Sequence, residues 1–304
     1  MGVSASQKQL FGLFAHPVGH SLSPVMHNRA FQALGLPFYY HPFDIPPERL
    51  PEAVAGLKAL GIRGINVTIP HKENIVPLLD ELDPEAEAIG AVNTVVLSET
   101  GRLTGYNTDG AGYVQSLLSE TGINLKETNV LLLGAGGAAK AIAVYLIKHG
   151  CASLTIANRT EHKAETLAHH VQRYAAQSHA GKRSSSPVRI NVHSWSQLDR
   201  DGVKAYQLII NTTPVGMWPN VGQVPLELKE LSPGTIVSDI VYNPLQTAFL
   251  KAAEQLGAQV HHGLGMFIYQ GALAFKLFTG YEAPLEVMRK VVKDQLNLSS
   301  SQGK

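Results

Sequence analysis

The chain has 304 residues, of which 44% are hydrophobic and 16% are charged, and its formal net charge is +1. This balance excludes the strong basic field that attracts nucleic acid, and the length predicts about two domains, each able to bury a core. A single cysteine, Cys151, excludes an internal disulfide framework, and because neither a run of about 18 apolar residues nor an apolar signal-peptide core is present, we expect a cytoplasmic protein that does not enter a membrane.

Apolar runs of strand length alternate with longer segments of helical periodicity along the chain. The predicted strands cover residues 10–15, 64–69, 129–135, 153–158, 207–213 and 235–241. The predicted helices cover residues 24–35, 47–60, 111–121, 137–149, 161–175 and 265–278. This alternation is typical of parallel sheets built from βαβ units, so the sequence predicts an α/β fold.

Residues 177–187, QSHAGKRSSSP, interrupt this pattern with small, polar and basic side chains. The composition predicts an exposed loop inside the second half of the chain rather than a domain linker. Lys182 and Arg183 leave an anion-binding patch as the alternative.

The predicted strand at 64–69 leads into an unusually polar segment, INVTIPHK (65–72). Asn66 and Thr68 lie two residues apart, so they face the same side of an extended strand. Lys72 follows at the carboxyl end of the strand, which is where open α/β sheets bind ligands. These groups can line one wall of a ligand pocket, whereas for Lys72 considered alone a surface lysine is the favoured interpretation.

Two further polar clusters lie in the same half of the chain. Ser21 and Ser23 precede a predicted helix in GHSLSP, and Asn93 and Asp109 lie within residues 90–112 ahead of another helix. Capping of a helix N-terminus explains each cluster separately. It explains less well why both clusters accompany Lys72, so a binding site is the second interpretation.

A glycine-rich turn follows the predicted strand at 129–135. Residues 134–139, GAGGAA, match the pattern G-x-G-x-x-[GA] between a strand and an Ala-rich helix. Small residues there permit a tight turn and let backbone N–H groups and the positive end of the helix approach a pyrophosphate. Another strand follows one βαβ unit later, so the segment predicts dinucleotide binding rather than a simple connection.

The end of that next strand indicates which dinucleotide is bound. NAD sites usually place an acidic residue there to bind the ribose 2′-OH, but this chain has Asn158, Arg159 and Thr160, with Lys163 close behind. A guanidinium and an ammonium group suit a 2′-phosphate, so NADP is predicted over NAD. Glu161 weakens this preference unless its carboxylate serves only the helix N-terminus.

These motifs occur together in an order that is typical of one enzyme family. The chain contains, in sequence, HPVGHSLSPVMHN, GINVTIPHK, GAVNT, GYNTDG, GAGGAA, ANRT, NTTPVGM, DIVYNP and GLGMFIYQGALAF. It therefore resembles the shikimate dehydrogenase family over nearly its whole length. The resemblance implies reversible, NADPH-dependent reduction of 3-dehydroshikimate to shikimate in aromatic amino acid biosynthesis, by a monomer or homodimer.

The resemblance also implies a domain organisation and a set of site residues. Residues 1–109 together with 264–304 would form the substrate domain, and residues 110–263 would form a Rossmann domain that binds NADP. Lys72 and Asp109 would be the catalytic pair. The implied substrate contacts are Ser21, Ser23, Asn66, Thr68, Asn93, Tyr242 and Gln270. The implied cofactor contacts are Gly134, Ala135, Gly136, Gly137, Ala138, Asn158, Arg159, Thr160, Lys163, Ile240 and Gly263.

A lysine paired with a carboxylate suits the reduction of a ketone. The ordinary pKa of lysine is about 10.4, and a nearby Asp109 favours the charged form further. A charged Lys72 can donate a proton to the developing alkoxide while Asp109 orients the ammonium group, and it can accept the proton in the reverse direction. This chemistry requires no metal.

Several alternatives remain open from the sequence. Quinate dehydrogenase activity is the alternative within the same enzyme class, because a single ring hydroxyl separates the substrates, and an NADP-binding sensor without turnover is the alternative from another class. Thirteen histidines suggest a metal site, but no HExxH or Cys/His set accompanies them. Tyr242 can be a packing aromatic, and Gln270 can bond a neighbouring carbonyl.

Overall fold

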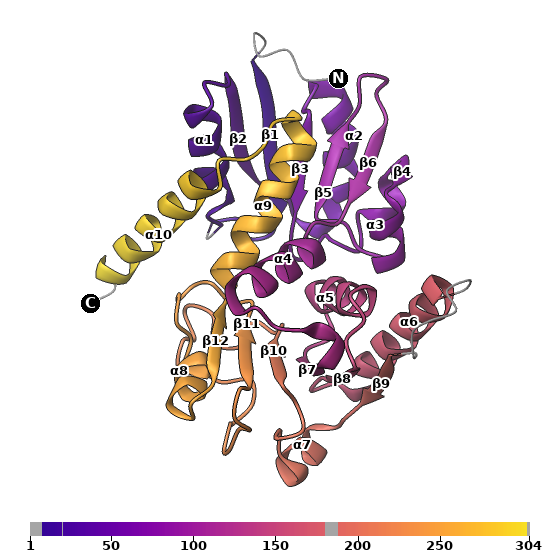
Figure 1. Ribbon diagram of the computed structural model, residues 1–304. Coiled ribbons are helices and arrows are strands. Elements are labelled where there is room, and N and C mark those ends of the chain that lie inside the picture. Colours follow the sequence, from indigo (N-terminus) through magenta and orange to yellow (C-terminus); the bar gives the residue numbers. More distant parts are fainter. Residues whose placement is uncertain (1–7, 20, 180–187, 303–304) are drawn as a thin grey trace. The chain divides into compact units, whose positions relative to one another are not determined.

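The computed structural model describes residues 8–19, 21–179 and 188–302 (Figure 1). The chain divides into two compact units, which we call the first and the second unit. The first is formed by Met1–Gly112 with Ile268–Lys304, and the second by Tyr113–Phe267. Two helices, α4 (Asp109–Thr121) and α9 (Gly263–Thr279), carry the chain from one unit to the other. Each unit contains its own six-stranded sheet.

The sheet of the first unit mixes parallel and antiparallel strands in the order β2-β1-β3-β5-β6-β4. Its strands are β1 (Gln9–Ala15), β2 (Phe38–Asp44), β3 (Gly64–Val67), β4 (Glu81–Leu82), β5 (Thr94–Leu97) and β6 (Leu103–Tyr106). β1 is parallel to β2 and β3, whereas β5 is antiparallel to β3 and β6. The prediction of parallel sheets alone is therefore wrong here, because the short turn 98–102 joins β5 and β6 as a hairpin, which is antiparallel by necessity.

Helices pack on both faces of this sheet (Figure 1). They are α1 (Ser23–Ala33), α2 (Leu50–Leu60), α3 (Pro84–Ile89), the second part of α9 and α10 (Leu285–Gln302), with short 3₁₀ helices at Pro47–Arg49 and Val76–Leu78. Phe11 of β1 packs against Phe31 of α1 and Phe278 of α9, with ring centroids 5.5 and 5.2 Å away. Ile65 of β3 points to the opposite face and is buried in a cluster with Leu57 of α2.

The sheet of the second unit is parallel throughout, with the order β12-β11-β10-β7-β8-β9. Its strands are β7 (Asn129–Leu133), β8 (Ser153–Ala157), β9 (Arg189–Val192), β10 (Leu208–Asn211), β11 (Ile236–Asp239) and β12 (Gln259–His262). Its helices are α5 (Gly137–Lys148), α6 (Glu161–His179), α7 (Trp195–Asp201) and α8 (Ala248–Gln255), with the second part of α4 and a 3₁₀ helix at Leu125–Glu127. The strand order reverses at β7, between β8 and β10. Open α/β sheets bind ligands at the carboxyl ends of the strands beside such a reversal.

The segment predicted as a loop at 177–187 differs in the structure. The helix α6 continues through His179, so the prediction is wrong for residues 177–179. Residues 176–179 contain neither glycine nor proline, so no helix-breaking residue ends α6 at the expected residue 175. Residues 180–187, with Lys182 and Arg183, lie outside the described residues.

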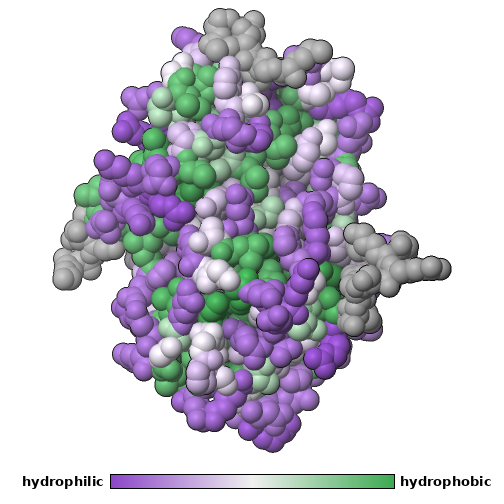
Figure 2. Space-filling view, in the orientation of Figure 1, coloured by the Kyte–Doolittle hydropathy of each residue, from purple (hydrophilic) through white to green (hydrophobic). Residues whose placement is uncertain are grey.

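Polar residues predominate on the face shown in Figure 2, and apolar residues form smaller areas between them. Among the helices of the described ranges, none combines the length and the apolar composition that a bilayer-crossing segment needs. The thiol of Cys151 is buried, and burial raises its pKa to about 12. That thiol is therefore a packing group rather than a nucleophile.

Candidate active site

Lys72 and Asp109 form a close ion pair in the first unit. Lys72 follows β3, and Asp109 is the first residue of α4. Lys72 Nζ lies 2.6 Å from Asp109 Oδ2, and the two side chains are 18% and 6% exposed. The backbone of Lys72 is fixed as well, because its carbonyl accepts a hydrogen bond from Val92 N at 2.8 Å. A charged donor is thus held in a nearly dry setting, where electrostatic interactions are stronger than in water.

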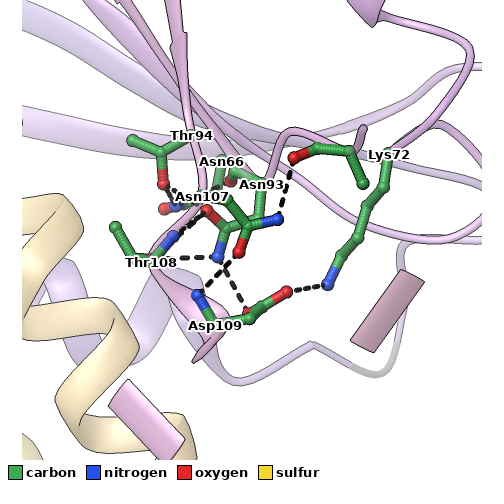
Figure 3. A network of polar contacts seen from close by, with 8 residues as sticks. Asn66, Lys72, Asn93, Thr94, Asn107, Thr108 and Asp109 are labelled. Carbon is green, nitrogen blue, oxygen red and sulfur yellow. Dashed lines mark hydrogen bonds and ion pairs between the residues drawn. The ribbon is translucent and has the colours of Figure 1, made fainter. Parts of the chain in front are cut away.

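A network of amide and hydroxyl groups fixes the carboxylate of Asp109 (Figure 3). Asn93 Nδ2 donates to Asp109 Oδ1 at 2.8 Å, and the Thr108 backbone N–H donates to Asn93 Oδ1 at 2.8 Å. Asn107 Oδ1 accepts from Asp109 N at 3.1 Å, while Asn107 Nδ2 donates to Ala91 O at 2.8 Å. Asn107 therefore satisfies the backbone at the start of α4. The carboxylate of Asp109 accepts instead from Lys72 and Asn93.

The structure locates the remaining predicted substrate contacts of this unit as follows. Ser21 Oγ accepts a hydrogen bond from Ser23 N at 3.2 Å, and the N-cap residue of α1 is Leu22, which has no side-chain cap bond. The capping interpretation is thus wrong for Ser23. Thr68 lies one residue beyond β3, which ends at Val67 rather than at residue 69, because a turn begins where His71 N donates to Thr68 O at 2.8 Å.

Gln270 lies on α9 where this helix passes the first turn of α4. A Cβ atom on Gly112 would lie 2.5 Å from Gln270 N, so glycine is required for the two helices to come this close. Gly112 follows Asp109 by three residues, which is nearly one helical turn. The structure therefore brings Gln270 to the same end of α4 as Asp109.

The glycine-rich turn of the second unit has the backbone geometry that the sequence predicts. Gly134 has φ = +115°, a conformation that side chains with a Cβ atom rarely adopt, and a Cβ atom there would clash with Thr212 Oγ1. Gly136 is the N-cap residue of α5, and a Cβ atom there would meet nothing within 4 Å. The turn is therefore open beside the N-terminus of α5, where the first backbone N–H groups have no intrahelical acceptor. These features fit the pyrophosphate of a dinucleotide.

The segment from Asn158 to Lys163 carries two cations, and its one acidic side chain, Glu161, is the first residue of α6. Asn158 is half-buried and donates to Thr160 O at 2.9 Å, whereas Arg159, Thr160 and Lys163 are exposed. Among the described residues, neither Arg159 nor Lys163 has an acidic partner within ion-pair distance. Both cations are thus available to an anionic group of a ligand.

Ile240 and Gly263 meet at the carboxyl end of β11. A Cβ atom on Gly263 would clash with Ile240 O, so this close approach requires glycine. Tyr242 follows in the same loop, and its ring stacks on Phe267 with centroids 4.3 Å apart. Tyr242 belongs to the second unit, whereas the other predicted substrate contacts belong to the first. The stacking supports the packing alternative for the ring of Tyr242.

Comparisons with known proteins agree on one family. Three family models match the chain: the shikimate dehydrogenase substrate binding domain at residues 13–95, shikimate / quinate 5-dehydrogenase at 116–183, and the shikimate 5'-dehydrogenase C-terminal domain at 263–293. A curated relative from Geobacillus sp. (strain WCH70), named shikimate dehydrogenase (NADP(+)), is 47% identical over 95% of this chain and 99% of its own. The chain belongs to the shikimate dehydrogenase family.

Solved structures of this family have the same fold. Shikimate 5-dehydrogenase from Thermus thermophilus, in complex with NADP(H) and shikimate, is 35% identical with a TM-score of 0.80, covering 94% of this chain and 99% of its own. Quinate dehydrogenase from Corynebacterium glutamicum, in complex with NAD, is 31% identical with a TM-score of 0.84, covering 95% of this chain and 100% of its own. The predicted family and the α/β class with a Rossmann-type unit are thereby confirmed.

The sequence analysis missed a buried carboxylate that links two loops of the second unit. Asp239, at the end of β11, is fully buried and accepts from Asn211 Nδ2 at 3.0 Å, Val241 N at 3.0 Å and Thr247 Oγ1 at 2.7 Å. Burial raises the pKa of Asp239 to about 6, against the opposing effect of these hydrogen bonds. Asn211 Oδ1 in turn accepts from Thr213 N at 3.0 Å. Asp239 thus holds the loops after β10 and β11 beside the glycine-rich turn.

Among the residues that the structure describes, no group of three or more His, Cys, Asp or Glu side chains could hold a metal ion. His16 instead contacts Asp44 at 2.8 Å, and His27 lies buried among aromatic rings, stacked on Tyr40. His20 lies outside the described residues. His16 and His27 therefore have other partners, and in the described ranges neither belongs to a group of side chains that could hold a metal ion.

Proposed function

We propose that this chain catalyses the reversible, NADPH-dependent reduction of 3-dehydroshikimate to shikimate, in the cytoplasm and as a monomer or homodimer. The Lys72–Asp109 pair carries the proposal, because its 2.6 Å contact sits among hydroxyl and amide side chains at the carboxyl end of β3. Neutral donors and acceptors suit a small ring acid that bears several hydroxyl groups. The 47% identity to a curated NADP(+)-dependent shikimate dehydrogenase supports the same reaction.

In this proposal Lys72 is the proton donor for ketone reduction. NADPH, when bound, supplies the hydride that adds to the carbonyl carbon. As the new C–H bond forms, the π electrons of the C=O bond move to oxygen, and Lys72 Nζ gives its proton to that oxygen. Asp109 and Asn93 hold the ammonium group in place, so little reorganisation is needed when charge develops. The neutral amine left behind regains a proton from water, and each step reverses for shikimate oxidation.

We assign substrate binding to polar side chains of the first unit, together with Tyr242 of the second. Ser21, Ser23 and Thr68 supply hydroxyl groups and Gln270 supplies an amide, all from segments in the same unit as Lys72. Asn93 already donates its two amide hydrogens to Thr108 Oγ1 and Asp109 Oδ1, so we assign it to fixing Asp109 rather than to donating to the substrate. Tyr242 is retained as a predicted contact. A site built from such groups rejects analogues that lack one substrate hydroxyl, because its own polar atoms would then be left unpaired.

We assign cofactor binding to residues of the second unit. The glycine-rich turn, residues 134–138, receives the pyrophosphate, and Asn158, Arg159, Thr160 and Lys163 receive the adenosine ribose and its 2′-phosphate. Ile240 and Gly263 line the carboxyl end of β11 for the nicotinamide part.

Two glycine variants separate a folding role from a binding role. Gly134→Ala should lower the free energy of unfolding by about 1 to 3 kcal/mol, because the new Cβ combines a positive φ with a clash against Thr212. Gly136→Ala should leave stability unchanged within about 0.5 kcal/mol, since its Cβ meets no protein atom, but raise the KM for NADPH at least tenfold. Urea unfolding and steady-state kinetics test both. A Gly136→Ala enzyme with normal KM would contradict the pyrophosphate assignment.

Arg159 and Lys163 should determine the preference for NADPH over NADH. The double variant Arg159→Ala/Lys163→Ala should lower kcat/KM for NADPH by about 10- to 100-fold, because two charge-assisted contacts to the 2′-phosphate are lost, and leave kcat/KM for NADH within about twofold. Arg173→Ala is the matched control, because Arg173 is an exposed cation further along α6. Equal losses with both cofactors would contradict this assignment.

The function itself is tested by a matrix of substrates and cofactors. Shikimate and quinate are each oxidised with NADP and with NAD, 3-dehydroshikimate is reduced with NADPH and NADH, and the change in absorbance of the reduced nicotinamide is followed. The proposal expects the largest kcat/KM for shikimate with NADP. An equal or larger value for quinate would support the quinate alternative. NADPH binding without turnover of any of these substrates would support the sensor alternative.

A further inference from the structure

Both the N–H₂ group and the oxygen of the Asn66 side-chain amide form hydrogen bonds within the protein. Asn66 Nδ2 donates to Asn93 O at 3.2 Å and to Thr94 Oγ1 at 3.1 Å, and Asn66 Oδ1 accepts from Tyr40 Oη at 2.8 Å. Only 7% of the residue is exposed. Both amide hydrogens thus have acceptors already, so no donor is left for a substrate hydroxyl.

Tyr40 anchors this amide in the observed orientation. Tyr40 lies on β2, and its hydroxyl group reaches past β1 to Asn66 on β3. Burial raises the pKa of Tyr40, so the hydroxyl group keeps its proton and donates. A flipped Asn66 amide would point its oxygen at the carbonyl of Asn93 and lose the hydrogen bond from Tyr40. The Asn93 carbonyl, which can only accept, therefore excludes the flipped orientation, and the Tyr40 hydroxyl holds the observed one by donating to Asn66 Oδ1.

The ring of Tyr40 is itself held in place. It is fully buried and stacks on the ring of His27 from α1, with centroids 4.5 Å apart and planes 4° from parallel. Burial lowers the pKa of His27 to about 3, so its ring is neutral and acts as a flat packing surface. The hydroxyl group of Tyr40 consequently has little freedom to leave Asn66.

The amide orientation of Asn66 propagates to Asp109 through two more side chains (Figure 3). Thr94 Oγ1 accepts from Asn66, so its own hydrogen is directed to Asn93 Oδ1, 3.0 Å away. With its oxygen receiving that bond, Asn93 turns its Nδ2 towards Asp109 Oδ1 at 2.8 Å. Asp109 Oδ2 then receives Lys72 Nζ. Each bond in this series favours the orientation that the next one needs, and the Thr108 backbone N–H, which also donates to Asn93 Oδ1, supports the same orientation of Asn93.

We propose that Tyr40 and Asn66 are positioning residues, which fix the carboxylate of Asp109, and hence the ammonium group of Lys72, through Thr94 and Asn93. The inference rests on the proposed function for its kinetic consequence. It revises the predicted role of Asn66, which acts through other residues rather than by touching substrate.

A double-mutant cycle tests the coupling. Tyr40→Phe and Asn66→Ala should each lower kcat about tenfold, with the KM for NADPH changed less than twofold, because the second unit is untouched. The double variant should be no slower than Asn66→Ala, since Tyr40 has nothing left to orient. Losses that multiply, or a Tyr40→Phe enzyme with wild-type kcat, would overturn the proposal. If Asn66→Ala fails to fold, Thr94→Val replaces it in the cycle.

Tyr113→Phe is the matched control. Tyr113 is also fully buried, and its hydroxyl group donates to Ser238 Oγ at 3.0 Å in the second unit. Its replacement removes the same atom and the same kind of hydrogen bond, so it should cost similar stability and leave kcat within about twofold. A tenfold loss in this control would mean that the Tyr40→Phe effect reports general destabilisation.

A second measurement keeps the inference separate from the proposed reaction. The side-chain amide hydrogens of Asn66 and Asn93 are followed by NMR hydrogen exchange in wild type, Tyr40→Phe and Tyr113→Phe. Tyr40→Phe should speed exchange at both asparagines at least tenfold, and Tyr113→Phe should not. Unchanged exchange overturns the positioning role even in an active enzyme. A wild type that fails to reduce 3-dehydroshikimate overturns the proposed function, while the exchange result still decides the positioning role.

Discussion

Lys72→Met should lower kcat for the reduction of 3-dehydroshikimate by about 10² to 10⁴, the usual contribution of a positioned acid or base. Methionine keeps much of the length and apolar stem of lysine but has no proton to give. The Asp109 carboxylate still accepts the hydrogen bond from Asn93 Nδ2, so the rest of the hydrogen-bond network can remain intact. The KM for NADPH should change little, since the residues assigned to the cofactor belong to the second unit.

Lys58→Met provides the control for this variant. Lys58 lies on α2 in the same unit and contacts Asp80 Oδ2 at 2.8 Å, so the replacement also removes a cation from an ion pair. That pair is far more exposed than the Lys72–Asp109 pair, and exposed pairs contribute little to stability. Lys58→Met should therefore keep kcat within about twofold. A Lys72→Met enzyme with kcat within a few-fold of wild type would remove Lys72 from the proton-transfer step.

Four of the six strands that the sequence pattern missed share a physical cause, whereas β5 and β6 are short interior strands that form the hairpin of the first sheet. β2 and β4 are the edges of the first sheet, and β9 and β12 are the edges of the second. An edge strand is covered on fewer sides, so its apolar pattern is weak: β2 even contains Pro42, which only an edge readily accepts. The central strands β7 and β8 are buried along nearly their whole length, and they were found as continuous apolar runs.

The candidate site likewise contains residues that the sequence made visible and partners that it did not. Lys72 and Asp109 stand at the ends of predicted elements within recognisable motifs, so their polar character was visible in the sequence, and the structure pairs them. The partner of Asn66 could not be found in this way, because Tyr40 lies in an unpredicted edge strand and reaches its partner past β1. The Asn211–Asp239 pair could have been predicted from the sequence. The parallel neighbours β10 and β11 end in these two residues, and the register places them side by side.

Asp239→Ala should destabilise the second unit by about 2 to 4 kcal/mol at pH 7. The change leaves three buried donors, on Asn211, Val241 and Thr247, without their acceptor, at about 1 to 3 kcal/mol each. Part of this cost is offset, because burial of the charged carboxylate is itself unfavourable and the variant no longer buries it. The shift of the Asp239 pKa from 3.8 to about 6 corresponds to about 3 kcal/mol of this unfavourable free energy. The KM for NADPH should rise as well, since the loops beside the glycine-rich turn lose their anchor.

The destabilisation should grow as the pH falls. The pKa of Asp239 is raised in the folded state, so the folded protein binds more protons than the unfolded chain between about pH 4 and pH 6. The carboxyl group therefore contributes most stability below about pH 4, and this contribution is lost as the pH rises through about 6. The difference between wild type and Asp239→Ala should accordingly be larger at pH 5 than at pH 7, while other titrating groups cancel in that difference.

Urea unfolding followed by tryptophan fluorescence measures this effect in the correct unit. Both tryptophans of the chain, Trp195 and Trp218, lie in the second unit with Asp239. Asp199→Ala is the control, because Asp199 is an exposed carboxylate of the same unit and should change the free energy of unfolding by less than about 0.5 kcal/mol at either pH. A difference that shrinks from pH 7 to pH 5 would show that burial does not dominate the titration of Asp239, and that its three hydrogen bonds hold the carboxylate charged.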